Sequence, residues 1–223
     1  MNYEIIGGNL PAAICKMRAG ETIICEKGAM SWMTDGIKMQ TKGGGFGKML
    51  GRGLSGDSMF RNHYVAERDG EIAFASSFPG DILAIELNGS NEIIAQKKAF
   101  LACDASVEMG VFFQKKLGAG FFGGEGFIMQ RFTGQGTVLL EIDGALRQYD
   151  LAAGERMIVD TGYLAMMDGT CSIDIETVGS LKNAVLGGEG IFNTVVTGPG
   201  RVFLQTMPII KTAMLISSYI PSK

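Results

Sequence analysis

The chain has 223 residues, of which 46% are hydrophobic and 19% charged, so it can bury a substantial core and is too apolar for a disordered protein. Its formal net charge of −3 argues against a nucleic-acid binder that relies on a general basic surface. No apolar run approaches the ~20 residues needed to cross a bilayer. The N-terminal stretch lacks the basic and apolar regions of a signal peptide, which predicts a cytoplasmic protein.

The glycine content and the spacing of the cysteines give two further predictions. There are 33 glycines and 5 prolines without a collagen-like period, which predicts many tight turns. The cysteines at positions 15, 25, 103 and 171 lie far apart and form no CxxC or zinc pattern. We expect four reduced thiols that pack as small hydrophobic groups.

One phrase recurs along the chain, at residues 20–26, 80–86 and 154–160. Each copy has a turn glycine, an acidic residue, an apolar strand of about four residues and a second acidic residue. A second, glycine-rich phrase alternates with the first at residues 53–60, 118–128 and 186–192. Two phrases in the same alternating order predict three copies of one β unit, at about 1–78, 79–152 and 153–207.

Each unit closes with two apolar strands around a glycine turn, at Asp69-Gly70, Gly134-Gln135-Gly136 and Gly198-Pro199-Gly200. We expect a hairpin at each turn. Short strands separated by frequent turns predict an all-β sandwich or barrel, in which three small units pack around a pseudo-threefold axis. Residues 208–219 predict one short C-terminal helix, with an apolar face that docks on the domain or on a neighbouring chain.

Internal pseudo-threefold symmetry suggests a closed homo-oligomer. The stretches GGGFGKMLGRGLSGDSMF, GEIAFASSFPGDILAIEL, FLACD and FFGGEGFIMQRFTGQGTVLLE resemble a bacterial family of uncharacterised proteins related to the yeast altered-inheritance-of-mitochondria protein. The resemblance covers roughly residues 3–208. It implies three short double-stranded β-helix units, similar to the subunit of the tryptophan RNA-binding attenuation protein, and a homotrimer. It implies no catalytic residues.

An enzyme is not favoured by the residues. His63 is the only histidine, and no G-x-S-x-G elbow accompanies it, so we interpret it as a surface or strand-edge residue. A cupin-type metal site needs two or three histidines. The run at residues 51–56 resembles GxGxxG but has no βαβ context. We therefore expect no catalytic residue, no cofactor and no metal site.

The glycine-rich loops carry three acidic residues at matching positions, namely Asp57, Glu125 and Glu189. Around a threefold axis they could hold Ca²⁺ or Mg²⁺. The alternative, which we favour, is that each carboxylate accepts backbone N–H groups of its own loop.

The same loops carry large apolar residues beside a lysine. These are Phe46, Met49 and Leu50 in the first loop, Leu117, Phe121 and Phe122 in the second, and Val185 and Leu186 in the third. On one exposed face they would suit a protein partner or a membrane surface. The alternative, which we favour, places them in the core or in the trimer interface.

The remaining conspicuous side chains are interpreted as core. Trp32 is expected to pack in a strand, and Met30, Met33, Met39, Met166 and Met167 are expected to fill the core. The sequence thus predicts a non-enzymatic homo-oligomeric protein that binds a partner or organises an assembly. A small-ligand or nucleic-acid binder, by fold analogy, and a peripheral membrane protein are the alternatives.

Overall fold

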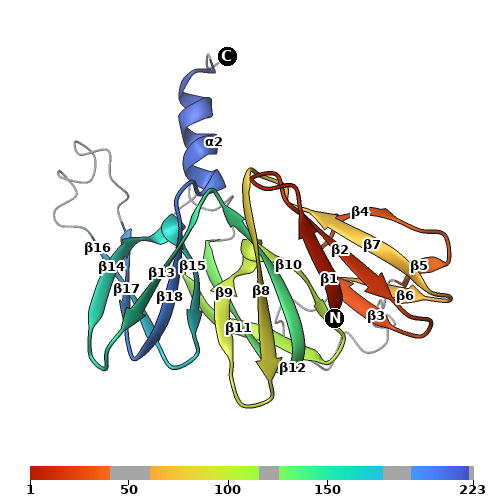
Figure 1. Ribbon diagram of the computed structural model, residues 1–223. Coiled ribbons are helices and arrows are strands. Elements are labelled where there is room, and N and C mark those ends of the chain that lie inside the picture. The colour runs from red at the N-terminus through yellow and green to blue at the C-terminus, as the bar shows by residue number, and fades with distance from the viewer. Residues whose placement is uncertain (41–60, 116–125, 178–191, 221–223) are drawn as a thin grey trace, which may run out of the picture.

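The structure is a computed structural model that describes residues 1–40, 61–115, 126–177 and 192–220. Antiparallel strands form three groups that lie side by side, and one helix rises from them (Figure 1). The sequence-based prediction of a mostly β chain with a short C-terminal helix is confirmed.

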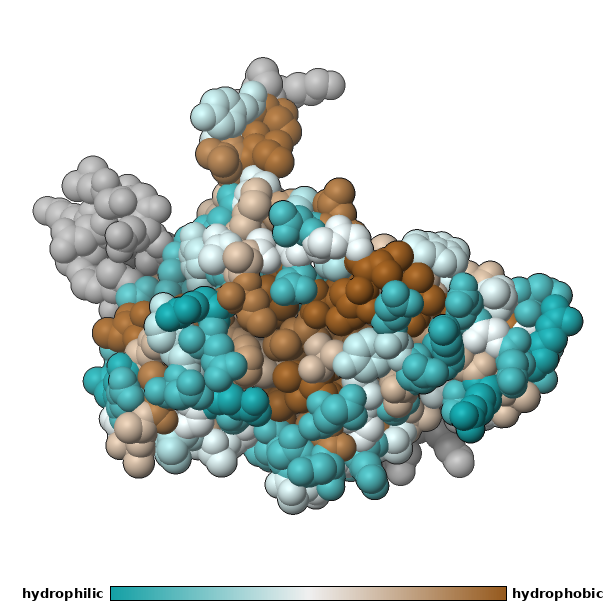
Figure 2. Space-filling view, in the orientation of Figure 1, coloured by the Kyte–Doolittle hydropathy of each residue, from teal (hydrophilic) through white to brown (hydrophobic). Residues whose placement is uncertain are grey.

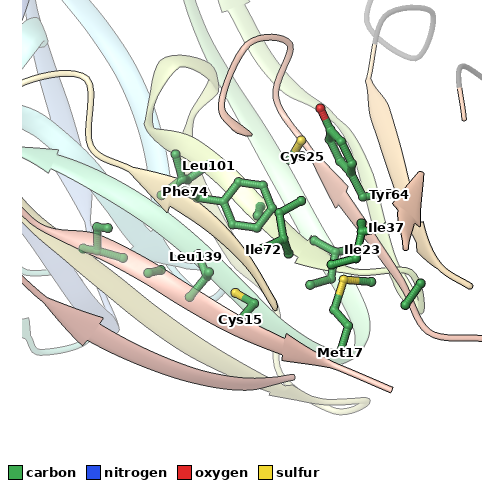
Figure 3. Close-up of a cluster of buried hydrophobic side chains, with 14 residues drawn as sticks. Cys15, Met17, Ile23, Cys25, Ile37, Tyr64, Ile72, Phe74, Leu101 and Leu139 are labelled. Carbon is green, nitrogen blue, oxygen red and sulfur yellow. The ribbon is translucent and has the colours of Figure 1, made fainter. Parts of the chain in front are cut away.

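The first group contains seven strands. They are β1 (Asn2–Ile6), β2 (Ala12–Met17), β3 (Thr22–Cys25), β4 (Met30–Met33), β5 (Ile37–Gln40), β6 (Asn62–Ala66) and β7 (Gly70–Ala75). One layer is a four-stranded sheet in the order β1-β2-β7-β4, and the other runs β3-β6-β5. Phe74 and Ile72 of one layer meet Ile23 and Tyr64 of the other in the core (Figure 3).

In the part that the structure describes, the second group contains five strands and one 3-10 turn. They are β8 (Gly80–Asn88), β9 (Ile93–Gln96), η1 (Lys97–Ala99), β10 (Phe100–Asp104), β11 (Val107–Lys115) and β12 (Phe127–Asp143). The first half of the long strand β12 pairs with β11 and β9, and its second half pairs with β8 and β10. This one strand therefore contributes to both layers of its group.

The third group contains six strands, a 3-10 turn and the helix. They are β13 (Leu146–Leu151), β14 (Arg156–Asp160), η3 (Thr161–Tyr163), β15 (Leu164–Asp168), β16 (Ser172–Thr177), β17 (Phe192–Thr197), β18 (Gly200–Gln205) and α2 (Ile209–Ser218). One layer runs β13-β18-β15, and the other is a separate three-stranded sheet in the order β14-β17-β16.

The groups share sheets across their boundaries. The order β8-β12-β10 continues into β3-β6-β5 of the first group, and β13-β18-β15 of the third group continues into β9-β12-β11 of the second. Two six-stranded sheets thus cross group boundaries through β12 and join the three groups into one body. The hydrophobic cores also cross the group boundaries, since Leu101 and Leu139 of the second group pack in the core of the first (Figure 3).

The predicted hairpins are wrong. β6 does not pair with β7, nor β17 with β18, and β12 runs unbroken through residues 134–136. The chain crosses from one layer to the other at each of these sites. Gly134 has a φ of 94°, and a Cβ atom there would lie 2.6 Å from the carbonyl oxygen of Ser106, so a glycine is needed at this crossing.

The first recurring phrase was also assigned incorrectly in the second group. Residues 20–26 lead into β3 and residues 154–160 into β14, whereas residues 80–86 lie in β8, which pairs with the second half of β12. The second-group strand that pairs as β3 does is β9, which is preceded by Ser90-Asn91. Asn91 accepts the N–H of Asn88 at 2.8 Å, as Glu21 accepts that of Arg18 and Glu155 that of Ala152.

The helix α2 matches its predicted span but not its predicted docking. None of its residues is buried, and Figure 2 shows its hydrophobic surface standing clear of the strands. Its first turn is fixed, because Ile209 N–H donates to Asp143 Oδ2 at 2.7 Å and Ile210 lies near Gly162. Within the described residues, no helix has the length and hydropathy of a transmembrane span.

Candidate functional site

The sites predicted from the glycine-rich loops lie outside the described residues. These are the apolar residues Phe46, Met49, Leu50, Leu117, Phe121, Phe122, Val185 and Leu186, and the acidic residues Asp57, Glu125 and Glu189. His63 is described and is half-buried in β6. That strand is paired on both sides, with β3 and β5, so the expectation of a strand-edge histidine is wrong. Within the described ranges, no three His, Cys, Asp or Glu side chains form a metal-binding group.

The described residues instead draw attention to the places where groups meet. At the first junction, β3 pairs with β10, with Ile24 opposite Cys103 and Cys25 opposite Ala102. Ile24 packs in the core of the second group and Ala102 in that of the first. Each strand of the junction therefore places side chains in its neighbour's core.

The second junction repeats this arrangement with other residues. Here β9 pairs with β15, with Ile94 opposite Met167 and Ala95 opposite Met166. Ile94 is fully buried in the core of the third group, and Met166 is fully buried in that of the second. Met166 and Met167 therefore fill the core as predicted.

Two strands have the same kind of partners but lack a junction. β4 pairs only with β7, and β14 pairs only with β17, among the strands that the structure describes. The remaining edge of each is an open edge, a row of backbone N–H and C=O groups able to accept another strand. β4 lies in the first group and β14 in the third, at opposite ends of the row (Figure 1).

The open edges carry exposed apolar side chains. Trp32 and Met33 of β4 are 47% and 37% exposed, and Ile158 of β14 is 64% exposed. The interpretation of Met33 and Met39 as core filler is therefore wrong, since Met39 of β5 is 52% exposed as well. Trp32 does lie in a strand, but its ring is not packed in a core within the described chain.

Strands β4, β10 and β15 share one irregularity. The register with β7 shifts between Met30 and Trp32, that with β12 between Phe100 and Ala102, and that with β18 between Leu164 and Met166. A polar residue at the end of β10 and of β15, and directly after β4, has a side chain that accepts a neighbouring backbone N–H. Thr34 accepts from Glu71 at 3.0 Å, Asp104 from Thr137 at 2.8 Å and Asp168 from Arg201 at 2.9 Å.

These acidic residues have different charge partners. Asp168 binds the guanidinium of Arg201 through both carboxylate oxygens, at 2.9 Å each, and this hydrogen bonding raises the pKa of Arg201. Asp104 instead accepts the N-terminal ammonium of Met1 at 3.0 Å, which links the first group to the second. Thr34 carries no charge.

A cavity of about 410 Å³ lies where the three groups meet below α2. Its wall includes Glu26, Lys98, Glu141 and Asp143, so both signs of charge face it. Burial raises the pKa of Asp143, partly opposed by the hydrogen bond from the N–H of Ile209. Gln96 also lines the cavity and is 8% exposed.

The four cysteines are free and buried, as predicted. Burial raises the pKa of Cys15, Cys25 and Cys103 to about 12 each, and it also raises that of Cys171. Buried thiols with so high a pKa are poor nucleophiles.

Sequence reasoning missed the open edges. The composition of β4 and β14 resembles that of the strands at the two junctions, so apolarity alone could not separate them. The available signal was positional: the middle unit lies between two neighbours, whereas the first and third units each have a free side.

The sequence profile of the mitochondrial biogenesis AIM24 family matches residues 3–207. An uncharacterized protein of Streptococcus pyogenes serotype M6, M6_Spy0233, is 29% identical over 221 residues, which cover 95% of this chain and 88% of that protein.

A solved structure is also similar. The crystal structure of protein SPYM3_0169 from Streptococcus pyogenes matches with a TM-score of 0.81 and 26% sequence identity, over 98% of this chain and 99% of that one.

Proposed function

The chain belongs to the mitochondrial biogenesis AIM24 family, and we propose that it acts as a non-enzymatic, self-assembling β module that binds a partner or organises an assembly. The observation that carries this proposal is the pair of open edges at β4 and β14. Each edge exposes apolar side chains, which is unusual for a strand that remains free in solution.

The pairing pattern supports three copies of one unit. The register shift occurs at the same place in β4, β10 and β15, and the polar residue after it accepts the same kind of N–H. On this basis β3, β9 and β14 are equivalent strands, and Ile24, Ile94 and Ile158 are equivalent residues.

The equivalence of β3, β9 and β14 indicates which strand could pair with each open edge. The two complete sheets have the orders β8-β12-β10-β3-β6-β5 and β13-β18-β15-β9-β12-β11. The chain also contains two smaller sheets, β1-β2-β7-β4 and β14-β17-β16. If β14 of one copy pairs with β4 of the next, the two form a third sheet of the same order, with β1 as one additional edge strand.

The two junctions also supply the register. Ile24 is opposite Cys103 and Ile94 is opposite Met167, so Ile158 of one copy would lie opposite Met33 of the next. Trp32 would lie opposite Val159, as Ala102 and Met166 lie opposite Cys25 and Ala95. Ile158 would enter the core of the first group of the next copy. Burial of a side chain of this size stabilises an interface by about 1.5–3 kcal/mol.

Pairing of β14 with β4 is head-to-tail, since the two edges differ. Such a contact closes into a ring or extends into a fibre. We propose a closed homotrimer, in which the β4 edge and the β14 edge of every copy are paired.

The proposal is tested by measuring mass in solution with light scattering after size exclusion. We expect the wild type to elute as a trimer and Ile158→Asp as a folded monomer, because an aspartate cannot enter an apolar core unpaired. Leu10→Asp is the matched control, since Leu10 is 71% exposed on the turn between β1 and β2. Trp32, the only tryptophan, gives a second readout, as its emission should shift to the blue on assembly. A monomeric wild type would reject the proposal.

A small-ligand binder is the second candidate, favoured by the cavity below α2. Its wall combines lysines, carboxylates and Gln96 with Ala99, Pro208, Ile209 and Ile210, which suits a small amphipathic molecule with a polar group. Native mass spectrometry of protein purified without denaturation tests this candidate. A retained small molecule that is lost in Lys98→Met would support it, and a bare chain mass would count against it.

The four free thiols support a reducing compartment for this assembly, and we propose a cytoplasmic location on that basis.

A further inference from the structure

The residue at the C-terminal end of β3, β9 and β14 differs among the three places. Glu26 directly follows β3, whereas Gln96 is the last residue of β9 and Asp160 the last residue of β14. In the second junction this position faces η3, the 3-10 turn directly before β15, and its side chain reaches the backbone carbonyl groups there.

Gln96 shows what a junction requires here. Its Nε2 lies 2.5 Å from the carbonyl oxygen of Leu164 and 3.3 Å from that of Gly162, so one amide donates across the second junction. Gln205 donates to the same Gly162 oxygen at 2.9 Å. The carbonyl groups around η3 thus receive side-chain donors from two strands.

Glu26 faces the corresponding place at the first junction. It lines the cavity below α2 together with Lys97 and Lys98, so cationic side chains share this wall with the carboxylate.

The side chain of Asp160 has no N–H group to donate, since a carboxylate only accepts hydrogen bonds. By equivalence it would face the carbonyl groups of Gly28 and Met30 of the next copy. A carboxylate that faces carbonyl oxygens is unfavourable, because both groups only accept hydrogen bonds, unless a donor lies between them. α2 provides a donor on the same chain, because Lys211 Nζ lies 2.5 Å from Asp160 Oδ2.

Lys211 is well placed for this role. It is half-buried in the first part of α2, and that part is held by the bond from Ile209 N–H to Asp143 and by the contact with Gly162. Its ammonium has three donors, of which Asp160 uses one. The ammonium therefore keeps donors for acceptors beyond the end of β14 as well as for Asp160.

We propose that Lys211 is the cross-junction donor of the assembly: held by Asp160, it donates to the Gly28 and Met30 carbonyl oxygens of the next copy, as Gln96 donates to Gly162 and Leu164 within one copy. This inference rests on the proposed pairing of β14 with β4. It gives α2 a function that its lack of buried residues otherwise leaves unexplained.

The test compares the trimer dissociation of four proteins at two salt concentrations by mass photometry or light scattering. They are the wild type, Lys211→Met, Asp160→Gln with Lys211→Met, and Lys16→Met, which changes an exposed lysine on β2. We expect Lys211→Met to weaken assembly tenfold or more, and Lys16→Met to leave it unchanged. The double variant should recover wild-type assembly, because a glutamine at position 160 supplies the donor that Gln96 supplies inside the chain.

Salt gives an independent readout. The wild type should lose affinity as salt rises, because a charged ammonium donates across the interface, whereas the double variant, whose donor is an uncharged amide, should not. The rescue separates this role from a merely structural one, since restoring a donor at position 160 does not repair a loosened α2.

The outcomes distinguish this inference from the proposed function. A trimer of equal strength in the wild type and Lys211→Met, or a double variant as weak as Lys211→Met, would overturn the role of Lys211 and leave the pairing intact. A wild type that stays monomeric would overturn both.

Discussion

The second junction and the open edge of β14 show the same type of strand in two environments. In β9, Ile94 is fully buried because β15 pairs beside it and the third core receives its side chain. In β14, Ile158 remains 64% exposed because no described strand lies there. If β9 and β14 are equivalent strands, as proposed, β9 shows the contact with its partner strand and β14 shows it without one. The contact of β9 then predicts the geometry in which β14 would be paired.

The largest difference between the two environments is expected when the same charged side chain is placed in each of them. Ile94→Asp puts an unpaired carboxylate in a sealed core, and we expect it to destabilise the chain by more than about 4 kcal/mol. Ile158→Asp should change the unfolding free energy of the isolated chain by no more than about 0.5 kcal/mol. Urea unfolding at low protein concentration measures both values. Similar losses in the two variants would show that the environments do not differ as the structure indicates.

The reactivity of cysteine thiols also distinguishes a buried junction from the open edge of β14. Cys25 and Cys103 are fully buried at the first junction, and their pKa of about 12, against 9.0 for a free thiol, lowers the thiolate fraction about a thousandfold at pH 8. A cysteine introduced as Ile158→Cys should react rapidly with a disulfide reagent in the monomer and slowly in the assembly. Rapid modification of all native cysteines in the folded protein would contradict the sealed junction.

The acidic residues at the ends of β10 and β15 give a smaller effect. Arg201→Met removes the bidentate partner of Asp168, and we expect a loss of about 0.5–1 kcal/mol, because the arginine is 44% exposed and its charge is screened by solvent. Asp168→Asn in the same background should cost little more, since the two residues act together. Thermal unfolding of the single and double variants measures the coupling. Additive losses of unfolding free energy in the double variant would exclude coupling between Arg201 and Asp168.

The smallest effect concerns Asp143, which anchors α2. Burial raises its pKa, so the folded chain holds this proton more tightly than the unfolded chain does. Stability should therefore fall as the pH rises from the usual aspartate pKa through the raised one. Asp143→Asn should remove this dependence, keep the acceptor for Ile209 N–H, and leave stability at pH 7 equal or higher by about 0.5 kcal/mol or less. If the stability of Asp143→Asn changed with pH in parallel with that of the wild type, Asp143 would not be the cause of the pH dependence.

The sequence predicted the class of fold because strand composition and turn residues act locally. It could not predict which strands pair. The Asp69-Gly70 turn looks like a hairpin locally, yet β6 and β7 separate into two layers because each has apolar partners in other strands. The second-group copy of the first phrase was misplaced for a related reason: Asn91 replaces a glutamate, and residues 80–86 imitate the pattern more closely.

The candidate site depended even more on tertiary context. The predicted loop residues lie outside the described chain, so they remain predictions. Trp32 and Ile158 are distinguished only by what lies beside their strands, and no local pattern encodes a missing neighbour. Lys211 and Asp160 are 51 residues apart, and only the fold brings them together.

The pairing of β14 with β4 is tested most directly by a disulfide between copies. Met33→Cys and Ile158→Cys lie opposite each other in the proposed register, at a separation that suits a disulfide bond. Mild oxidation of this double variant should give covalent trimers on a non-reducing gel, whereas Met33→Cys with Tyr149→Cys, an exposed residue of β13, should not. Equal yields from the two pairs, or only monomers from both, would contradict the account.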